Sequence, residues 1–351
     1  MSTNPGTRHA GGAKTPVKPI TLALQGGGAH GAFAWGVLDR LLEDERLAIE
    51  GISATSAGAM NAAVLAYGLL KGGPPCARTA LHNFWRDVSS TAQLCSPFRK
   101  LPWETWLHRG YGLDSSPMYM LTDLLLRVLS PYDFNPFNFN PLRDVLARHV
   151  DFDALSRHCP IQLYLCATNV ETGSLRVFSR GEVCLKAVLA SACLPSLFRA
   201  VEIDGQHYWD GGYVGNPAIF PLIYNCGTRD VVIVHINPIV RKGVPKTAME
   251  ILNRINEVSF NSSLIRELRA ISFITTLIQD GKVTEMKEML IHSIGSDQTM
   301  TALGVSSKFN ADWDFLCYLR TQGRDQAEHW LAQNYSAIGE RCSVDLRKEF
   351  F

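Results

Sequence analysis

Near the amino terminus, the pattern of apolar and polar positions predicts two strands and two helices in alternation. Residues 20–24 form a short apolar run without charge, which is typical of a buried strand. The run opens into glycines at 26–31, and apolar residues then recur at helical spacing over 33–42. A second short strand, 50–54, leads through a turn of small residues into an alanine-rich helix, 59–70. In such a βαβα unit both strand-to-helix turns lie at the carboxyl edge of a parallel sheet, where open α/β folds bind ligands.

The same pattern continues along the chain and predicts an α/β fold throughout. The runs 161–167 and 231–234 are apolar and uninterrupted, as buried parallel strands are. Asp204 and Gly205 form a turn signal between two short strands, so residues 201–209 are expected to form a hairpin. Residues 74–90 are expected to be a loop that leads into a helix. The other predicted strands are 175–178 and 289–294, and the other predicted helices are 120–129, 183–191, 247–277, 312–320 and 324–334.

Two segments leave alternatives open. Residues 95–141 interleave aromatic residues with prolines. This segment is either an insertion packed on the core or a hydrophobic cap that touches a bilayer surface. The amphipathic stretch 247–277 is expected to pack on the core, and a homodimer face or a membrane-surface helix is its alternative.

Composition divides the chain into three parts. Residues 1–18 are polar and aperiodic and lack the apolar stretch of a signal peptide, so we expect a disordered tail. Residues 19–240 carry the alternating strands and helices, with 95–141 as an insertion, and 241–351 are expected to form a helical extension packed on this core. Residues 51–70 carry no charge, but their polar residues and three glycines favour a buried strand and helix over a membrane span.

Charge and cysteine content exclude several classes of protein. The 351 residues include 34 basic and 33 acidic ones, a net charge of +1, so no excess of positive charge supports nucleic-acid binding. Nine cysteines are scattered without a C-x-x-C pair, which argues against a zinc site and a disulfide framework. An odd number of cysteines without a secretion signal favours a reducing, cytoplasmic location, with export by a signal-less route as the alternative.

The turn around Ser56 has the features of an exposed nucleophile. A serine on a sharp strand-to-helix turn needs small residues two positions before and after it, and Ala54 and Gly58 meet this need. Backbone N–H groups of the new helix and of the glycine loop can then point at a negatively charged oxygen, and one such donor contributes about 3–4 kcal/mol in acyl transfer. We therefore expect an acyl-transfer site formed by Ser56 and the loop 26–31.

The same residues allow other interpretations. The glycine spacing from Gly26 to Gly31 also fits a loop that binds a nicotinamide dinucleotide. That fold places an acid at the end of the second strand, however, and here the only acid, Glu50, stands at its start. A phosphate-binding loop requires Lys-Ser or Lys-Thr immediately after the glycines, and neither pair stands there. Ser56 alone would also suit a helix N-cap.

Asp210 is the second candidate for chemistry. Because Asp204 and Gly205 already close the hairpin, Asp210 is expected just beyond its second strand, followed by two permissive glycines. Trp209 beside it is expected to lower the local dielectric. A carboxylate at this place can hold a serine hydroxyl and accept its proton.

Three blocks of sequence together resemble the patatin-like phospholipases, a family of lipid acyl hydrolases. These blocks are residues 26–31, the elbow 54–58 and residues 210–212, in the family's order, and residues 191–195 and 216–217 resemble two further family segments. The resemblance implies a patatin-like three-layer α/β core with a mostly parallel sheet flanked by helices.

The resemblance also implies the chemistry of the site. Ser56 would be the nucleophile and Asp210 the base of a dyad that uses neither histidine nor metal nor cofactor. The implied oxyanion-binding residues are Gly26, Gly27, Gly28, Ala29 and Ala57, and the implied supporting residues are Gly31, Ala54, Gly58, Gly211 and Gly212.

Two positions depart from the family pattern. Ala54 stands where the elbow usually begins with glycine, and one methyl group still satisfies the need for a small residue. His30 stands where the glycine loop usually carries Arg or Lys. A neutral His30 would weaken the positive potential at the loop, and a protonated one would restore it. His235, after the strand 231–234, is expected to be a histidine hydrogen-bonded at a strand end, so the dyad should work without it.

The sequence therefore predicts a lipid acyl hydrolase that cleaves phospholipids or lysophospholipids at a carboxylic ester, in peripheral contact with a membrane and without a nucleic-acid partner. Two alternatives use the same fold: an acyltransferase with the same dyad, and a non-catalytic lipid-binding or scaffold protein. A nicotinamide-dependent oxidoreductase is the third alternative.

Overall fold

The computed structural model describes residues 16–96, 98, 111–114 and 116–351. Within these residues, one mixed sheet has eight strands. Seven of them follow the order β5-β6-β3-β2-β1-β7-β8, and the eighth, β4, pairs with residues 165–168 in the carboxyl-terminal half of β3. The strands β3, β2, β1, β7 and β8 are parallel, whereas β4 and β6 run antiparallel to β3. The strands are β1 (Lys18–Leu24), β2 (Leu47–Thr55), β3 (Gln162–Asn169), β4 (Leu175–Phe178), β5 (Val201–Ile203), β6 (Gln206–Asp210), β7 (Asp230–His235) and β8 (Leu290–Gly295).

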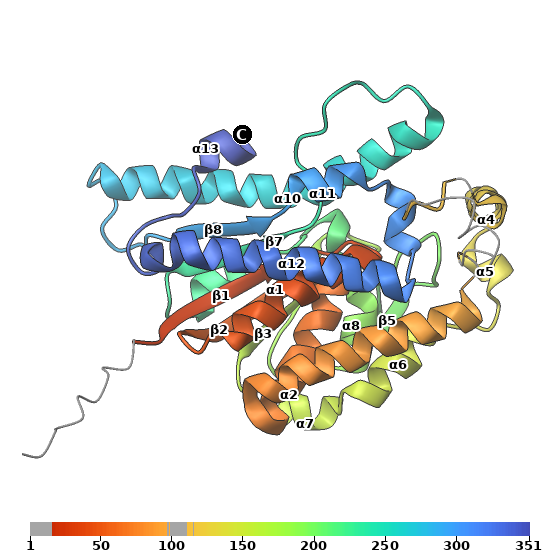
Figure 1. Cartoon of the computed structure of the whole chain (residues 1–351), viewed down its shortest axis with the longest axis horizontal. Coiled ribbons are helices and arrows are strands. Elements are labelled where there is room, and N and C mark those ends of the chain that lie inside the picture. Colours follow the sequence, from red (N-terminus) through yellow and green to blue (C-terminus); the bar gives the residue numbers. More distant parts are fainter. Residues whose placement is uncertain (1–15, 97, 99–110, 115) are drawn as a thin grey trace, which may run out of the picture.

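Helices cover both faces of this sheet, and the alternation of strand residues decides which face each helix covers (Figure 1). Leu22, Ile52 and Val232 point to one face, in a core with helices α1, α2 and α12. Their neighbours Ala23 and Ile233 point to the other face, beneath α9, α10 and α13. The six helices are α1 (Gly31–Glu43), α2 (Ala57–Cys95), α9 (Phe220–Asn225), α10 (Ala248–Gln279), α12 (Trp313–Asn334) and α13 (Leu346–Phe350). The expected three-layer α/β architecture with a mostly parallel sheet is confirmed.

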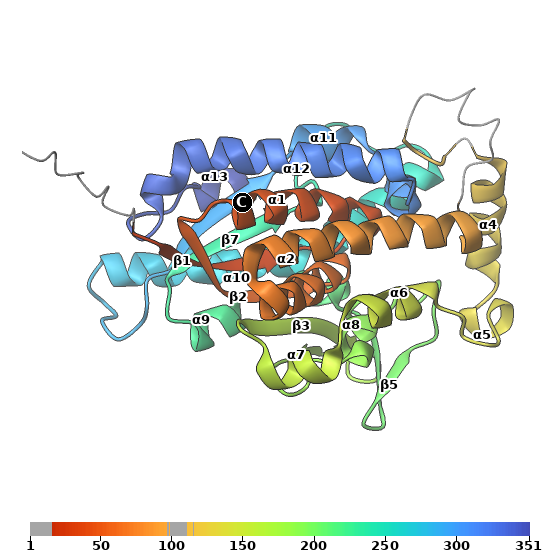
Figure 2. The same cartoon turned by 60° about the horizontal axis from the view of Figure 1, so that its bottom comes forward.

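Shorter helices connect these layers. Helices α6 and α7 lie beside α2, and α8 packs on β3 and β5 (Figure 2). The remaining elements are α4 (Pro117–Val128), α5 (Pro131–Phe134), α6 (Pro141–His149), α7 (Phe152–His158), α8 (Leu185–Ser191), α11 (Asp297–Ala302) and the 3-10 turns η1 (Gly28–His30), η2 (Gly211–Tyr213), η3 (Val305–Phe309) and η4 (Tyr335–Ala337).

Two of the predicted helix boundaries are wrong. Residues 74–90 are helical from their start, because Gly72 and Gly73 make a kink and Pro74 and Pro75 then occupy the first turn of the second part of α2, where proline is tolerated. The predicted helices 312–320 and 324–334 are one helix, α12. Gly323 does not interrupt it; the absence of a side chain lets α12 lie directly against the backbone of Phe33 in α1.

The residues after 240 share the sheet and the layers of the preceding part. β8 pairs with β7 over Asp230–His235, and α10 and α12 cover opposite faces. The predicted division at residue 240 stays a prediction. The predicted tail lies outside the described residues up to residue 15, as does most of 97–110 within the aromatic segment.

The described part of the aromatic segment exposes much apolar surface. Helices α4 and α5 project at one end of the molecule, beyond the last turns of α2 (Figures 1 and 2). Large exposed side chains of this segment are Met120, Leu121, Leu124, Leu125, Val128, Tyr132, Phe137 and Phe139. No helix in the described part of the chain combines the length and the apolar character that crossing a bilayer requires.

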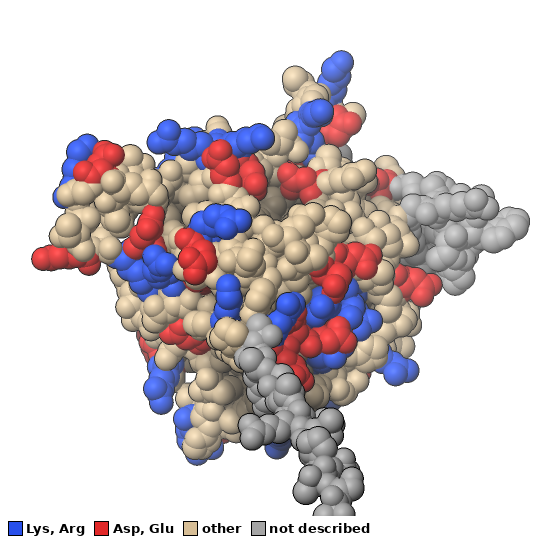
Figure 3. Space-filling view, turned by 60° about the vertical axis from the view of Figure 1, so that its left-hand side comes forward, with Lys and Arg blue, Asp and Glu red and all other residues tan. Residues whose placement is uncertain are grey.

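Charges are mixed over the surface. On the face that carries the start of β1, basic and acidic groups lie next to one another over an otherwise uncharged surface (Figure 3). This mixture of signs agrees with the net charge of +1.

Candidate active site

The two predicted strand-to-helix turns meet at the carboxyl edge of the sheet. β1 ends at Leu24 and β2 at Thr55, and these strands are paired in register up to Leu24 and Ala54. The glycine loop therefore lies beside Ser56. A side chain at Gly26 would place its Cβ atom 2.5 Å from the Cβ atom of Ser56, so only glycine fits there.

Ser56 has a strained backbone. Its φ of 57° and ψ of −124° lie where non-glycine residues are rare, between the end of β2 and the first residue of α2. Such a conformation costs about 1–3 kcal/mol and persists only where surrounding structure enforces it. Here the Ser56 N–H donates to Ser191 Oγ at 3.0 Å, and Gly58 lies against the carbonyl groups of Leu24 and Gln25. This is the geometry of a nucleophile held on a sharp turn.

Buried amide side chains hold the glycine loop. Gly26 donates its N–H to Asn216 Oδ1 at 2.7 Å, and its carbonyl accepts from Asn237 Nδ2 at 2.8 Å. The Gly26 N–H is thus occupied and is not available to an oxyanion. No acceptor is found among the described residues for the N–H groups of Gly27 and Gly28, and Gly28 adopts a left-handed φ of 59°. The supporting residue Gly31 lies against Ala57.

Asp210 is a buried acid with a fixed backbone. It is the last residue of β6 rather than a residue beyond the strand, and its N–H donates to the carbonyl of Cys193 at 2.8 Å. Its Oδ1 accepts from the Gly212 N–H at 2.7 Å. Burial raises the pKa of Asp210 to about 7, although the Gly212 N–H and the Ser56 hydroxyl favour its charged form. A carboxylate with such a pKa can accept a proton near neutral pH.

The sheet brings Ser56 and Asp210 to the same place. Thr55 pairs with Cys166, and Asp210 pairs with the next residue, Ala167. Because β4 occupies the other edge of β3 at these residues, β2 and β6 follow one another along the same edge, and their ends meet there. The Ser56 hydroxyl is near enough to lower the pKa of the Asp210 carboxyl group. Asp210 Oδ2 has no aligned hydrogen-bond donor among the described residues. A contact that is close but not fully aligned is common in catalytic pairs without substrate.

His30 is neutral in this structure. Its ring is buried, and burial followed by the charge of Lys308 lowers the pKa of His30 to about 3. The ring Nε2 lies 2.7 Å from Ser307 Oγ. Of the two states considered for the glycine loop, the uncharged histidine is the one present.

His235 is the last residue of β7, and its side chain contacts residues of α11 and α13. Its ring Nδ1 is 3.6 Å from Asp297 Oδ1, and its ring lies edge-on to Phe350. Burial lowers the pKa of His235, against the opposite effect of Asp297. These contacts agree with a structural histidine at a strand end.

Sequence reasoning missed several residues that hold the site. Ser191 and Asn216 appeared in the sequence analysis only as members of the family-like segments 191–195 and 216–217. Nothing in the local sequence indicated a role for Asn237 or Lys308. Lys308 donates from Nζ to Asn237 Oδ1 at 2.7 Å.

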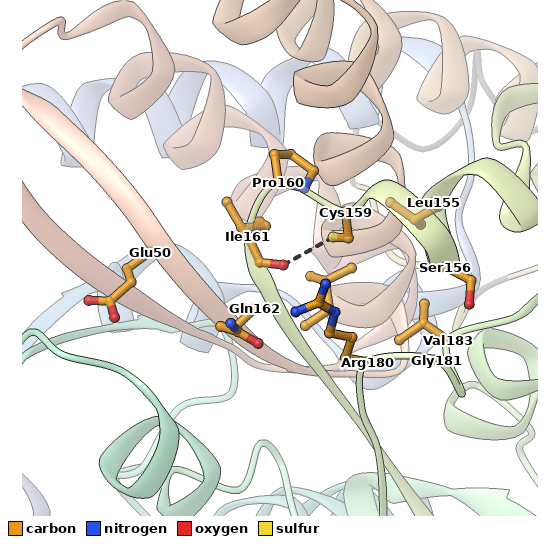
Figure 4. A pocket seen from close by; sticks show the side chains of 11 residues that line it. Glu50, Leu155, Ser156, Cys159, Pro160, Ile161, Gln162, Arg180, Gly181 and Val183 are labelled. Atoms are coloured by element: carbon orange, nitrogen blue, oxygen red, sulfur yellow. Dashed lines mark hydrogen bonds between the residues drawn. The ribbon is translucent and has the colours of Figure 1, made fainter.

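A separate cavity of about 370 Å³ lies at the other end of β3 (Figure 4). Cys159, Gln162 and Arg180 line it, and Cys159 Sγ donates to the carbonyl of Ile161 at 3.1 Å. It contains neither Ser56 nor Asp210, and the described residues offer no cluster of three metal-ligating side chains.

A model of the patatin-like phospholipase family matches residues 22–223, more than half of the chain. The protein belongs to the patatin-like phospholipase family. The match covers the glycine run, Ser56 and Asp210, and it decides against the dinucleotide-binding interpretation of that run. No curated protein matches the sequence.

Solved structures similar to this one include two bacterial effector proteins. VipD from Legionella pneumophila is 16% identical with a TM-score of 0.40, over 90% of this chain and 67% of VipD. The type III effector ExoU is 17% identical with a TM-score of 0.35, over 91% of this chain and 54% of ExoU. The chain thus spans about half to two-thirds of these proteins. A further structure holds ExoU with SpcU from Pseudomonas aeruginosa, at 19% identity and a TM-score of 0.33, over 95% of this chain and 65% of that one.

Proposed function

We propose that this member of the patatin-like phospholipase family cleaves a carboxylic ester of a phospholipid or lysophospholipid through a Ser56–Asp210 dyad. The observation that carries the proposal is the strained Ser56 at the strand-to-helix turn, with the buried Asp210 close enough to interact with its hydroxyl. Family membership supports the broader statement that the protein is a lipid hydrolase.

The proposed reaction follows from the positions of these groups. Ser56 Oγ attacks the acyl carbonyl carbon and gives its proton to Asp210. The oxyanion that forms is bound by the N–H groups of Gly27 and Gly28, with Ala29 and Ala57 as the neighbouring donors. The alcohol leaves with the proton from Asp210, which leaves an acyl group on Ser56. Water then attacks this acyl-enzyme while Asp210 accepts its proton. Asp210 returns the proton to Ser56 Oγ as the bond to the acyl group breaks, which releases the fatty acid and restores the dyad.

Contact with a lipid surface is part of the proposal. Helices α4 and α5 expose apolar side chains at the end of the molecule where the strands β1 and β2 finish. Tyr119 belongs to a small buried cluster against which Leu197 and Phe309 pack. Arg199 donates to the carbonyl of Tyr132, so this segment borders the loops around the site. An enzyme whose substrate lies in a bilayer requires an apolar surface beside its site.

The first part of α10 has a similar character. Its later turns pack on the sheet through Leu264 and Leu268, whereas Ile251, Ile255 and Val258 are exposed. Figures 1 and 2 place this exposed end of α10 at the same end of the molecule as α4. This favours the membrane-surface alternative for the first turns of α10; a homodimer stays a prediction.

The test combines covalent labelling with product analysis. We expect a fluorophosphonate to label Ser56 in the wild-type protein, and the protein to release fatty acid from a mixed lipid extract. Ser56→Ala and Asp210→Asn should lower the rate of release at least 1,000-fold, because they remove the nucleophile and the base.

His235→Gln is the matched control, since it alters a buried strand-end residue outside the dyad and should keep most of the activity. A folded His235→Gln protein as inactive as Ser56→Ala would overturn the dyad. Lipid binding without labelling or product would indicate the non-catalytic alternative, and acyl transfer to an added alcohol in place of hydrolysis would indicate an acyltransferase.

A further inference from the structure

The glycine loop 26–31 carries no charged side chain of its own. Its one titratable residue, His30, is buried, neutral and in contact with Ser307. The residue after Ser307 is Lys308, in the 3-10 turn η3. Lys308 lies outside the residues 22–223 that match the family, so its place beside the loop is a feature of this chain's carboxyl-terminal part.

Lys308 contacts the glycine loop directly through its backbone and indirectly through its side chain. Its backbone carbonyl lies against the Cα atom of Gly28, where a side chain would collide with it. Its Nζ donates to Asn237 Oδ1 at 2.7 Å, and Asn237 Nδ2 in turn donates to the carbonyl of Gly26 at 2.8 Å. One asparagine thus connects the ammonium group to the loop that lies over Ser56.

Lys308 also reaches towards the block that holds Asp210. Its Nζ lies 5.6 Å from the centre of the Phe260 ring, and this ring lies directly against Gly212. Gly212 is the residue whose N–H donates to Asp210. The ammonium group is also near enough to Asp210 for each charge to favour the other.

The charged and titratable groups that face Lys308 come from four other parts of the chain. Glu257 of α10 and Asp210 of β6 favour the charged lysine, whereas Arg241 before α10 opposes it. His30 of η1 is held neutral, in part by Lys308. Glu257 itself pairs with Arg241 and Arg254 at 2.6 Å and 3.1 Å, so its charge is already largely matched.

We propose that Lys308 is a positioning residue for the ester cleavage proposed above, supplying from η3 the positive charge that His30 does not provide. Its ammonium group stabilises the charged form of Asp210 and raises the positive potential at the amides that bind the oxyanion. This inference rests on the proposed function and adds a requirement that the dyad alone does not make.

The charge of Lys308 sets the alkaline limit of activity. Burial lowers the pKa of Lys308 to about 8, so its positive charge is lost as the pH rises through that value. Asp210 must be charged to accept a proton, and its pKa is about 7. The rate should therefore rise through pH 7 and fall again through pH 8.

The test compares Lys308→Met and Lys308→Arg with the wild-type protein. The measurements are kcat/KM on a soluble short-chain ester and the rate of fluorophosphonate labelling, both from pH 5.5 to 10, with the melting temperature as a check of folding. In Lys308→Met we expect the alkaline limb to vanish, the acid limb to move to higher pH and the maximal labelling rate to fall about 10- to 100-fold.

Lys308→Arg separates charge from structure. Arginine stays charged throughout this range, so most of the rate should persist while the alkaline limb disappears. Lys282→Met is the control for net charge, because Lys282 is exposed and pairs only with Asp280 at 2.9 Å. It should leave both limbs in place.

Three outcomes decide the matter. Unchanged limbs in a folded Lys308→Met protein would overturn the proposal for Lys308. An alkaline limb still near pH 8 in Lys308→Arg would do the same, even where Lys308→Met fails to fold. Absence of wild-type labelling, together with full activity in Ser56→Ala, would instead overturn the dyad itself.

Discussion

At the scale of single residues, the role proposed for Asp210 places a buried carboxyl group where it lowers the stability of the fold. Burial without a salt-bridge partner raises the pKa of Asp210 from 3.8 to about 7. Between these values the folded protein binds more protons than the unfolded chain does. The free energy of unfolding therefore falls as the pH rises through this window, and above it the charged carboxylate is present at full cost.

Asp210→Asn should remove this cost. The amide oxygen can still accept the N–H of Gly212, and the side chain stays neutral at every pH. We expect the variant to be more stable than the wild-type protein at pH 8 by about 2–4 kcal/mol, with the difference vanishing near pH 4. Urea denaturation at the two pH values measures it. Asp280→Asn, at an exposed carboxylate, is the control; a variant that loses stability equally at both pH values would contradict the expectation.

Local signals identified Ser56 and Asp210, but the residues that support them had none. A serine between small residues and an aspartate before two glycines mark turns that can be recognised within a few positions. Asn237 and Lys308 contact the glycine loop only because β7 and η3 are brought to it by the fold. These contacts join residues far apart in the chain, so no local pattern in a single sequence indicates them.

At the scale of elements, strands were easier to predict than helix boundaries. The buried parallel strands are short apolar runs with clear ends. The structure contains each of them within two residues, except that β2 begins at Leu47, three residues before the predicted start. The helix boundaries near residues 72–75 and 321–323 were predicted wrongly, because glycine and proline can end a helix or be accommodated within one. At Gly72 and Gly73 the helix kinks, whereas at Gly323 the missing side chain permits close contact between α12 and α1.

The contact between α1 and α12 is secured by one buried carboxylate. Asp39 of α1 accepts from Arg78 of α2 at 2.7 Å and from Arg320 of α12 at 2.8 Å, and also from Arg324. Burial alone would raise the pKa of Asp39, but the hydrogen bonds from Arg78 and Arg324 outweigh it and hold the pKa below its usual value. The carboxylate therefore connects three helices on one face of the sheet.

Asp39→Asn should be strongly destabilising, because it leaves three guanidinium groups without their shared partner. We expect a loss of about 2–3 kcal/mol, less than for a fully buried pair since the arginine side chains are 27–32% exposed. Thermal or urea unfolding measures the loss. Glu328→Gln, which removes an exposed partner of Arg40, should cost no more than about 0.5 kcal/mol. Equal effects of the two substitutions would show that Asp39 does not hold the helices together.

At the scale of the whole molecule, the sheet has two different ends. The amino-terminal ends of β2 and β3 border a cavity lined by Cys159 and Arg180, and the surface around the start of β1 carries mixed charges. The carboxyl ends hold Ser56 and Asp210, with the apolar α4–α5 segment and the exposed first turns of α10 on the same side. This difference between the two ends supports the proposal that only the end with Ser56 meets a lipid surface.

This arrangement predicts that binding to vesicles and chemistry at Ser56 can be separated by substitution. Val128 and Phe137 are 75% and 92% exposed, so Val128→Ser together with Phe137→Ser should change stability little. Each lost side chain removes about 1–2 kcal/mol of insertion free energy, so the double variant should bind phosphatidylcholine vesicles about 30- to 800-fold more weakly in co-sedimentation. Fluorophosphonate labelling in solution should not change, because neither side chain belongs to the dyad or the glycine loop.

The matched control lies at the other end of the sheet. Met286 is 54% exposed in the connection between α10 and β8, and Met286→Ser removes a comparable apolar side chain from the charged end. It should leave vesicle binding unchanged. If both variants weaken binding equally, association with lipid depends on total apolar surface rather than on the end that carries Ser56. If neither does, α4 and α5 cover the site without touching the bilayer, and the packed interpretation of this segment holds.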